Sequence, residues 1–443
     1  MKSEKERISL LNNYVDWISV LNKIEVAVHL FLITIVITIM LTIGGFLSFI
    51  LLSVIVYISL LFHKGMKKRR RIIRDKYFIR DRLRYFIQAN NLFEESIRES
   101  EQRDNQGRWS IVREKYISNS AVFSYEQTET KLIVYAYKNA DNFTAKMSRF
   151  EEGLRSLFGL DIEQVLDRNT VVEYHMIIES PERLDLTITN EIKIGNSLDI
   201  NLGYGVTYNP VKCPHILMSG GTGSGKSVFI SFLLLEFLKR KSTVYICDPK
   251  NSDLGSLSHY IGDEKIATTS NNIARVVRLA VSEMNDRYKH MNENFIYGSN
   301  FVDHGYNPIW LVFDEMGAFQ ASGTDKKSKE VVNEVMEGLK QIILLGRQSG
   351  VFVLVSAQQM NSNTLNTDLR DNLGLRIALG ANSQEGYRMV FGSSTPETIP
   401  PIEVKGSGLL YMQGSGKESA QYYESPFVDM RNFNFIKELK RYI

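Results

Sequence analysis

The chain has 443 residues, with 53 Lys or Arg against 50 Asp or Glu and a formal net charge of +3. This length allows a membrane segment plus two soluble domains, and the balanced charge excludes a bulk polyanion binder. The two cysteines, Cys213 and Cys247, are too few for a disulfide framework and indicate a reduced, cytosolic main part. The seven histidines show no metal-ligand spacing, and His215 is predicted to be structural rather than catalytic.

A short N-terminal segment, residues 1–25, precedes a long apolar run. The 37 residues from Val26 to Phe62 contain no Asp, Glu, Lys or Arg. Since one membrane-spanning helix needs about 20 residues, this run predicts a transmembrane hairpin of two helices with a turn near Gly44 and Gly45. Two alternatives are a hairpin buried in a soluble core and a cleaved signal peptide, whose apolar region would be only about 7 to 15 residues long.

A basic juxtamembrane segment, residues 63–75, follows the predicted hairpin. It contains KGMKKRRRIIR, with seven Lys or Arg and no acid. By the positive-inside rule this end is cytoplasmic, so we expect a multi-pass protein of the plasma membrane with both termini in the cytoplasm. The segment would bind anionic lipid headgroups or, alternatively, nucleic acid. Without residues 64–74, 46 basic residues face 50 acidic ones, so any DNA contact elsewhere must be local.

Residues 76–205 are predicted to form a small α+β module. Alternating apolar residues indicate strands within 121–139 and 171–180, and Phe143 to Leu157 has the pattern of a helix. No motif in this module indicates a chemical function.

A glycine-rich loop lies between an apolar strand and an apolar helix in HILMSGGTGSGKSVFISFLLLEF, residues 215–237. Its pattern G-x-x-x-x-G-K-[ST] predicts a cradle for the phosphates of ATP, in which backbone N–H groups curl around the phosphates and the lysine reaches them. A flexible loop without a ligand is the alternative. The predicted ATP-binding residues are Gly220, Gly221, Thr222, Gly223, Ser224, Gly225, Lys226 and Ser227, together with Asp314.

Residues 206–443 alternate strands with helices, which predicts a parallel sheet covered by helices. The strand IWLVF, residues 309–313, is followed by Asp314 and Glu315. At the carboxyl end of a strand, Asp314 would hold Mg²⁺ together with Ser227, through the nucleotide, and Glu315 would act as the general base toward water. We therefore expect Lys226 and Glu315 among the catalytic residues of an ATPase.

Two further catalytic candidates flank the strand at 351–357. Gln358 follows it and would orient water, although a polar strand terminus is the alternative. Arg347 precedes it and would reach the nucleotide of a neighbouring subunit, although an arginine that offsets a helix dipole is nearly as good an interpretation. Arg376 and Arg388 are weaker candidates for the same role.

Several motifs resemble, in the same order, the motor domain of the FtsK/SpoIIIE translocases. They are CPHILMSGGTGSGKSV, ICDPKNSDL, EMNDRYKHM, WLVFDE, GRQSGVFVLVSAQ, DNLGLRIALG and the closing KGSGLLYMQG. The resemblance implies a RecA-like P-loop NTPase motor that assembles as a homo-oligomeric ring, usually a hexamer, and pumps double-stranded DNA through its pore. The sequence departs from the family's pattern, because we expect two spans rather than four and neither the long Pro/Gln linker nor the C-terminal winged-helix module.

This architecture is most similar to the TcpA-type coupling proteins of Gram-positive conjugative elements. The resemblance implies delivery of DNA to a type IV secretion channel, with a relaxase and channel proteins as partners. A chromosome or plasmid partition translocase and a type VII-like protein-secretion ATPase remain alternatives. A non-enzymatic scaffold would not need the intact phosphate-loop residues.

The DNA contacts of a sequence-blind motor are expected in short loops facing the pore. One candidate is the segment after Glu315, and the other is the loop from Asn361 to Arg370. Ordinary solvated loops are the alternative. The candidate residues are Lys326, Lys327, Lys329, Asn361, Asn363 and Arg370.

Overall fold

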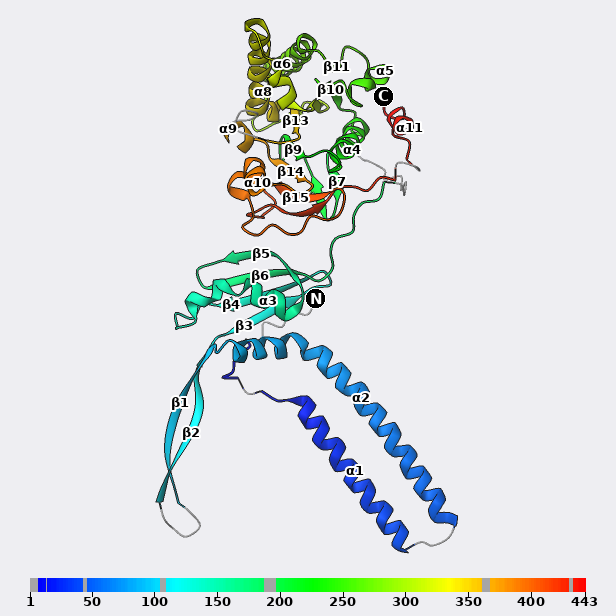
Figure 1. Ribbon diagram of the computed structural model, residues 1–443, viewed down its shortest axis with the longest axis vertical. Coiled ribbons are helices and arrows are strands. Elements are labelled where there is room, and N and C mark those ends of the chain that lie inside the picture. The colour runs from blue at the N-terminus through cyan, green and yellow to red at the C-terminus, as the bar shows by residue number, and fades with distance from the viewer. Residues whose placement is uncertain are drawn as a thin grey trace. The chain divides into compact units, whose positions relative to one another are not determined.

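The computed structural model describes residues 7–12, 14–42, 46–103, 109–186, 197–360, 367–429 and 433–443. The chain divides into two compact units, Met1–Glu179 and Ser180–Ile443 (Figure 1). The expected turn at Gly44 and Gly45 lies outside the described residues, as do Asn361 and Asn363.

The N-terminal unit combines two long helices with an antiparallel sheet. Its elements are α1 Trp17–Thr42, α2 Phe46–Ala89, β1 Phe93–Arg103, β2 Trp109–Ser120, β3 Phe123–Gln127, β4 Lys131–Tyr137, the 3₁₀ helix η1 Thr144–Arg149, α3 Glu151–Phe158, β5 Asp161–Asp167 and β6 Val171–Ile177.

Helices α1 and α2 pack against each other and are long and apolar enough, by length and composition, to cross a membrane. Most of their apolar side chains are exposed, unlike those of a hairpin buried in a soluble core. Helix α2 continues without a break through the basic segment, because Lys and Arg are good helix formers and this stretch contains no proline. Its last turns place Leu83, Phe86 and Ile87 in the core of the following module.

The module has a four-stranded antiparallel sheet in the order β3-β4-β6-β5. Alternate residues of β4 and β6 are buried, which matches the alternation seen in the sequence. Strands β3, β4 and β6 were predicted, whereas β5 and the two-stranded ribbon β1-β2 were not. The single helix expected from Phe143 to Leu157 is divided into η1 and α3.

The C-terminal unit is an eight-stranded mixed sheet with helices on both faces. Its elements are β7 Ile200–Gly203, β8 Val206–Tyr208, β9 Ile216–Gly220, α4 Lys226–Lys239, β10 Thr243–Cys247, η2 Gly255–Leu257, α5 Ser258–Ile261, β11 Ile266–Ala267, α6 Ser270–Glu293, β12 Ile309–Phe313, α7 Met316–Ala321, α8 Lys326–Ser349, β13 Val351–Ala357, α9 Thr367–Asp371, β14 Leu375–Leu379, α10 Gln384–Phe391, η3 Gly392–Ser394, β15 Ser407–Met412, β16 Gln421–Glu424 and α11 Phe435–Leu439.

The strand order is β11-β10-β12-β13-β9-β14-β15-β16. In this order, all neighbouring strands from β11 through β10, β12, β13 and β9 to β14 pair in parallel, as predicted. Strands β15 and β16 then extend the sheet with antiparallel pairing. Every residue of β9, β12, β13 and β14 is buried, because helices cover both faces. Alternate residues of the strands join two cores, one under α4 and the other under α6, α8 and α10.

This unit begins earlier than the expected boundary at residue 206. The division falls after Glu179, and the small hairpin β7-β8 belongs to the C-terminal unit. Ile200, Leu202 and Tyr208 are fully buried in the same core as Phe229 of α4. The physical reason for the shift is therefore apolar packing, which the polar sequence around the hairpin conceals.

Candidate nucleotide site

The glycine-rich loop connects β9 to the first turn of α4, as predicted. Gly223 and Gly225 have φ angles of +83° and +99°, in the left-handed region that favours glycine. Gly225 is also the N-cap of α4, so no side chain caps the helix, and its first turn contains no acid. The uncapped N–H groups and the helix dipole therefore form an anion site at this loop.

Close packing restricts two of the glycines. A Cβ on Gly220 would lie 2.5 Å from Ser224 Oγ, and one on Gly225 would lie 3.2 Å from the Cα of Gly406. Gly406 immediately precedes β15 in the closing segment KGSGLLYMQG. This segment could be recognised in the sequence by its resemblance to the family, but no role for Gly406 could be predicted. In the structure, Gly406 lies against the phosphate loop.

Lys226 lies between the two acidic residues at the end of β12. Its Nζ is 3.3 Å from Asp314 Oδ1 and 2.5 Å from Glu315 Oε1. All three side chains are buried, and Ser356 Oγ donates a hydrogen bond to Asp314 Oδ1. The sheet order explains this meeting, because β13 lies between β9 and β12 and all three strands end at the same edge.

Glu315 has a φ of +51°, which is unusual for a residue with a side chain. Such backbone conformations occur preferentially at functional sites, where surrounding contacts hold them. Its second oxygen, Oε2, is 3.2 Å from Lys250 Nζ, so a lysine lies at each oxygen of the carboxylate. In the sequence, Lys250 belongs to the motif ICDPKNSDL, which alone predicts no role for it.

Lys250 belongs to a loop that Asp248 organises at the end of β10. Asp248 is fully buried, and its Oδ2 accepts hydrogen bonds from the backbone N–H of Ser252 and of Gly255, at 2.7 and 2.9 Å. Its Oδ1 accepts a hydrogen bond from the backbone N–H of Lys250 itself, at 3.2 Å. The buried carboxylate thereby fixes the loop that carries the second lysine to Glu315.

These residues fit a nucleotide with Mg²⁺. The loop offers backbone donors for phosphates, and Ser224 Oγ is buried without a hydrogen-bond partner among the described residues. Ser227, in the first turn of α4, is exposed, and Asp314 supplies a carboxylate just after the end of β12. Hydroxyl and carboxylate oxygens are the ligands that Mg²⁺ prefers beside phosphates.

The other predicted catalytic residues lie at different edges of the sheet. Gln358 follows β13 at the carboxyl edge, next to the site, and its side chain is exposed. Arg347 lies in the last turn of α8, just before β13, and its Nε donates a hydrogen bond to the carbonyl of Val211 at 3.0 Å. Within one chain Arg347 is thus at the opposite edge from the phosphate loop.

The candidate DNA residues after Glu315 are in a helix rather than in a loop, which corrects the expectation. Asp325 caps α8 by accepting hydrogen bonds from the backbone N–H of Lys327 and of Ser328, and Ser328 completes a capping box. The three exposed lysines, Lys326, Lys327 and Lys329, therefore form the first turn of α8. Arg370, on α9, is engaged with Asp371 at 3.1 Å.

The weaker arginine candidates differ in burial. Arg376 is buried in β14, and its Nε and Nη1 each donate to a backbone carbonyl at 3.0 Å. Arg388 lies in the last turn of α10.

His215 has the structural role expected of it. It is fully buried at the start of β9, and its Nδ1 accepts a hydrogen bond from the backbone N–H of Val353 at 3.1 Å. Burial lowers the pKa of His215 to about 3, so the ring is neutral near pH 7.

Residues 182–390 match the FtsK/SpoIIIE family. The FtsK domain-containing protein YdcQ of Bacillus subtilis (strain 168) is 32% identical over 231 residues, which cover 52% of this chain and 46% of YdcQ. The DNA translocase FtsK of Staphylococcus aureus (strain Mu50) is 24% identical over 308 residues, which cover 59% of this chain and 37% of that protein. The chain thus spans less than half the length of these curated relatives.

A solved structure has a similar fold. The pCW3 conjugation coupling protein TcpA, in a monomer form with ATPgS, aligns with a TM-score of 0.51 and 17% identity, over 73% of this chain and 94% of TcpA. Together with the phosphate loop and the paired acids at the end of β12, these comparisons show that residues 182–390 are an FtsK/SpoIIIE family domain with the fold of the P-loop ATPases.

Proposed function

We propose that this protein is a membrane-anchored, ATP-driven DNA translocase and that it is the coupling protein of a conjugative type IV secretion channel. The main observation in support of the motor activity is the buried cluster of Lys226, Asp314 and Glu315 beside the phosphate loop. The relatives named DNA translocase FtsK support DNA as the substrate, and the fold of the coupling protein TcpA supports the conjugative role.

Each residue of the site has a separate role in ATP hydrolysis. ATP with Mg²⁺, when bound, supplies the phosphoanhydride whose hydrolysis drives movement. Lys226 exchanges its carboxylate partners for phosphate oxygens, and Ser227 and Asp314 hold the metal ion. Glu315, released from Lys226, accepts the proton of the attacking water, while Gln358 orients that water.

The N-terminal helices anchor the motor in the plasma membrane. The uncharged run of α1 and α2 is long enough for two spans, and the basic segment after it supports a cytoplasmic position for both termini. The motor assembles as a hexameric ring around DNA, so that Arg347, at the edge opposite its own phosphate loop, serves the nucleotide of a neighbouring subunit. A relaxase and the channel proteins are the expected partners.

ATP hydrolysis by the full chain in detergent tests the motor. Double-stranded DNA should stimulate the rate, whereas Lys226→Ala should weaken nucleotide binding. Glu315→Gln should bind ATP and lose turnover by about 10²-fold or more. Wild-type turnover in Glu315→Gln would contradict the assignment of the base. A rate that responds to secreted protein but not to DNA would contradict the DNA substrate.

The lysine-rich first turn of α8 is the proposed DNA contact. Lysines are unfavourable at a helix N-terminus because the dipole is positive there, and the N-cap Asp325 is the one acid set against these three lysines within residues 325–329. Replacing all three with Ala should leave basal hydrolysis nearly intact and reduce DNA affinity together with its salt dependence. The residues replaced in this variant are Lys326, Lys327 and Lys329. The control variant replaces the exposed Lys437, Lys440 and Arg441.

Equal loss of DNA affinity in both triple variants would mean that total charge, rather than this helix turn, binds DNA. Unchanged affinity in the α8 variant would move the contact to the loop of residues 361–370.

A further inference from the structure

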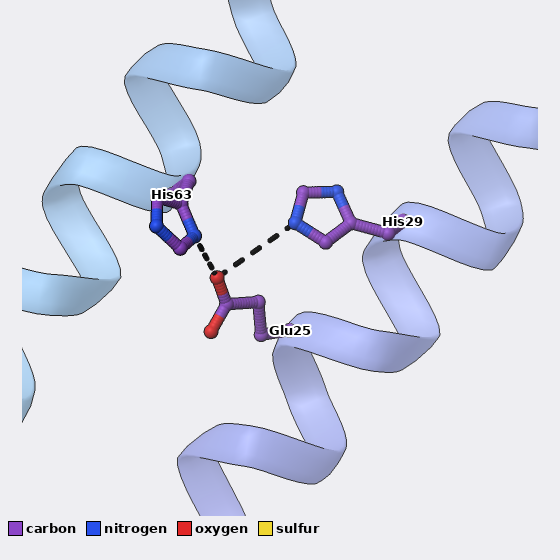
Figure 2. Close-up of side chains that lie close together, drawn as sticks. All are labelled: Glu25, His29 and His63. Atoms are coloured by element: carbon purple, nitrogen blue, oxygen red, sulfur yellow. Dashed lines mark hydrogen bonds and ion pairs between the residues drawn. The ribbon is translucent and has the colours of Figure 1, made fainter.

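Three side chains of metal-ligating type meet between α1 and α2 (Figure 2). Glu25 and His29 are one helical turn apart on α1, and His63 faces them from α2. Glu25 Oε1 is 2.6 Å from His63 Nδ1 and 3.7 Å from His29 Nε2, and the three ligand atoms lie within 4.8 Å of one another. This cluster could not be predicted from the sequence, because packing of the two helices brings together histidines that are far apart in the chain.

Neighbouring groups orient His29 and Glu25. Ser59 Oγ is 3.2 Å from His29 Nδ1, which leaves Nε2 directed at the carboxylate. Arg70 pairs with the second carboxylate oxygen, Oε2 of Glu25, and also donates a hydrogen bond to Asn22. Partners of this kind fix ring orientation and carboxylate geometry around metal ions in proteins.

We propose that Glu25, His29 and His63 bind a divalent transition-metal ion of the Zn²⁺ class. Two imidazoles and one carboxylate are a ligand set that Zn²⁺ takes readily. Bonds of about 2.0–2.2 Å in tetrahedral geometry place ligand atoms about 3.3–3.6 Å apart, and the two distances to Glu25 Oε1, 2.6 and 3.7 Å, lie on either side of this range. Ion binding would bring the three ligand atoms, which now lie within 4.8 Å of one another, to these separations by side-chain rotation.

The fourth position of this site is left to water. The side chain of His63 is 57% exposed, whereas that of Glu25 is 9% exposed, so the site opens on the His63 side. The guanidinium of Arg70 offsets part of the carboxylate charge and makes the site weaker than a closed structural zinc centre. Glu25 and His63 directly flank the uncharged run, so the ion would join the two ends of the apolar hairpin.

Zn²⁺ binding by the full chain tests this proposal. The protein is purified in detergent with an affinity tag that contains no histidine, stripped with chelator and titrated with Zn²⁺ in the absence of nucleotide. We expect one Zn²⁺ per chain with micromolar affinity or better, and a visible absorption spectrum of tetrahedral type when Co²⁺ is used instead. Neither readout depends on ATP hydrolysis or on DNA.

Two substitutions of similar size separate a metal ligand from a hydrogen-bond partner. His63→Asn should lower Zn²⁺ affinity at least tenfold. His63→Asp, which supplies a carboxylate ligand in place of the imidazole, should retain most of the Zn²⁺ affinity. The control is His175→Asn, which removes a histidine that pairs with a single carboxylate, that of Glu173, at 3.1 Å. This control should bind Zn²⁺ like the wild type.

Several results would overturn the proposal. They are a wild-type chain that binds no stoichiometric Zn²⁺, a Co²⁺ complex without tetrahedral absorption, or equal Zn²⁺ affinity in wild type and His63→Asn. In each case the three side chains would only hydrogen-bond to one another and so link α1 to α2 without a metal ion. The wild-type measurements decide even if a variant fails to fold.

Discussion

His215 should make the C-terminal unit less stable as the pH falls below about 6.5. The ring is fully buried, and its Nδ1 accepts a hydrogen bond, so a proton on that nitrogen would lose the bond and place a charge in the core. Burial lowers the pKa of His215 to about 3, while the unfolded chain has the ordinary value near 6.5. Between these values the unfolded state binds more protons, so stability is complete above the unfolded pKa and is lost as the pH falls.

The size of this effect follows from the two pKa values. Proton linkage predicts a loss of about 1.4 kcal/mol in the free energy of unfolding between pH 7.5 and 5.5, and about 2.7 kcal/mol between pH 7.5 and 4.5. A matched variant is His215→Asn. The φ of residue 215 is +61°, which Asn tolerates, and its side-chain oxygen can accept a hydrogen bond without titrating.

Fluorescence of Trp310 reports the unfolding of this unit alone. The chain has three tryptophans, and replacing Trp17 and Trp109 with Phe leaves Trp310, which is buried and stacked on Phe237 at 4.0 Å between ring centroids. Urea unfolding is measured at pH 7.5, 5.5 and 4.5 with and without His215→Asn. If the two proteins lose stability in parallel as the pH falls, the histidine is not the group responsible and the reasoning is refuted.

Two further predictions concern the nucleotide site. Gly225→Ala should weaken ATP binding in equilibrium titrations without unfolding the chain. The reason is that φ is +99° and the new Cβ would lie 3.2 Å from the Cα of Gly406. Unaltered ATP affinity would contradict the loop geometry. Lys250→Met should reduce kcat for ATP about threefold to tenfold with KM little changed, because a partly exposed lysine at 3.2 Å holds one oxygen of Glu315. An equal decrease in the control Lys289→Met would show a nonspecific effect of removing charge.

The local parts of the site could be predicted from the sequence. The loop from Gly220 to Ser227 and the acids at the end of β12 form short motifs, and each lies beside an apolar strand that the sequence shows directly. Strand order then determines that Lys226 and Glu315 meet. Since parallel strands end at one edge of a sheet, this contact follows from the fold class.

Contacts between distant segments could not be predicted in this way. Lys250 reaches Glu315 because a buried carboxylate folds the loop after β10, and nothing in the local pattern of charges specifies that bend. The ribbon β1-β2 was missed because both its strands mix charged and apolar residues. One error was avoidable, because Asp325 followed three residues later by Ser328 is a helix-start signal that places the lysines in α8.

The contact between Gly225 and Gly406 has a consequence for synthesis of the protein. The phosphate loop leaves the ribosome about 180 residues before the segment that packs against it, and at typical rates of elongation this delay is roughly 10 to 40 s. Until β15 is made, strand β14 also lacks its outer neighbour and presents an open edge. The backbone that packs against Gly225 is therefore absent from the nascent motor domain until nearly the whole domain has been made.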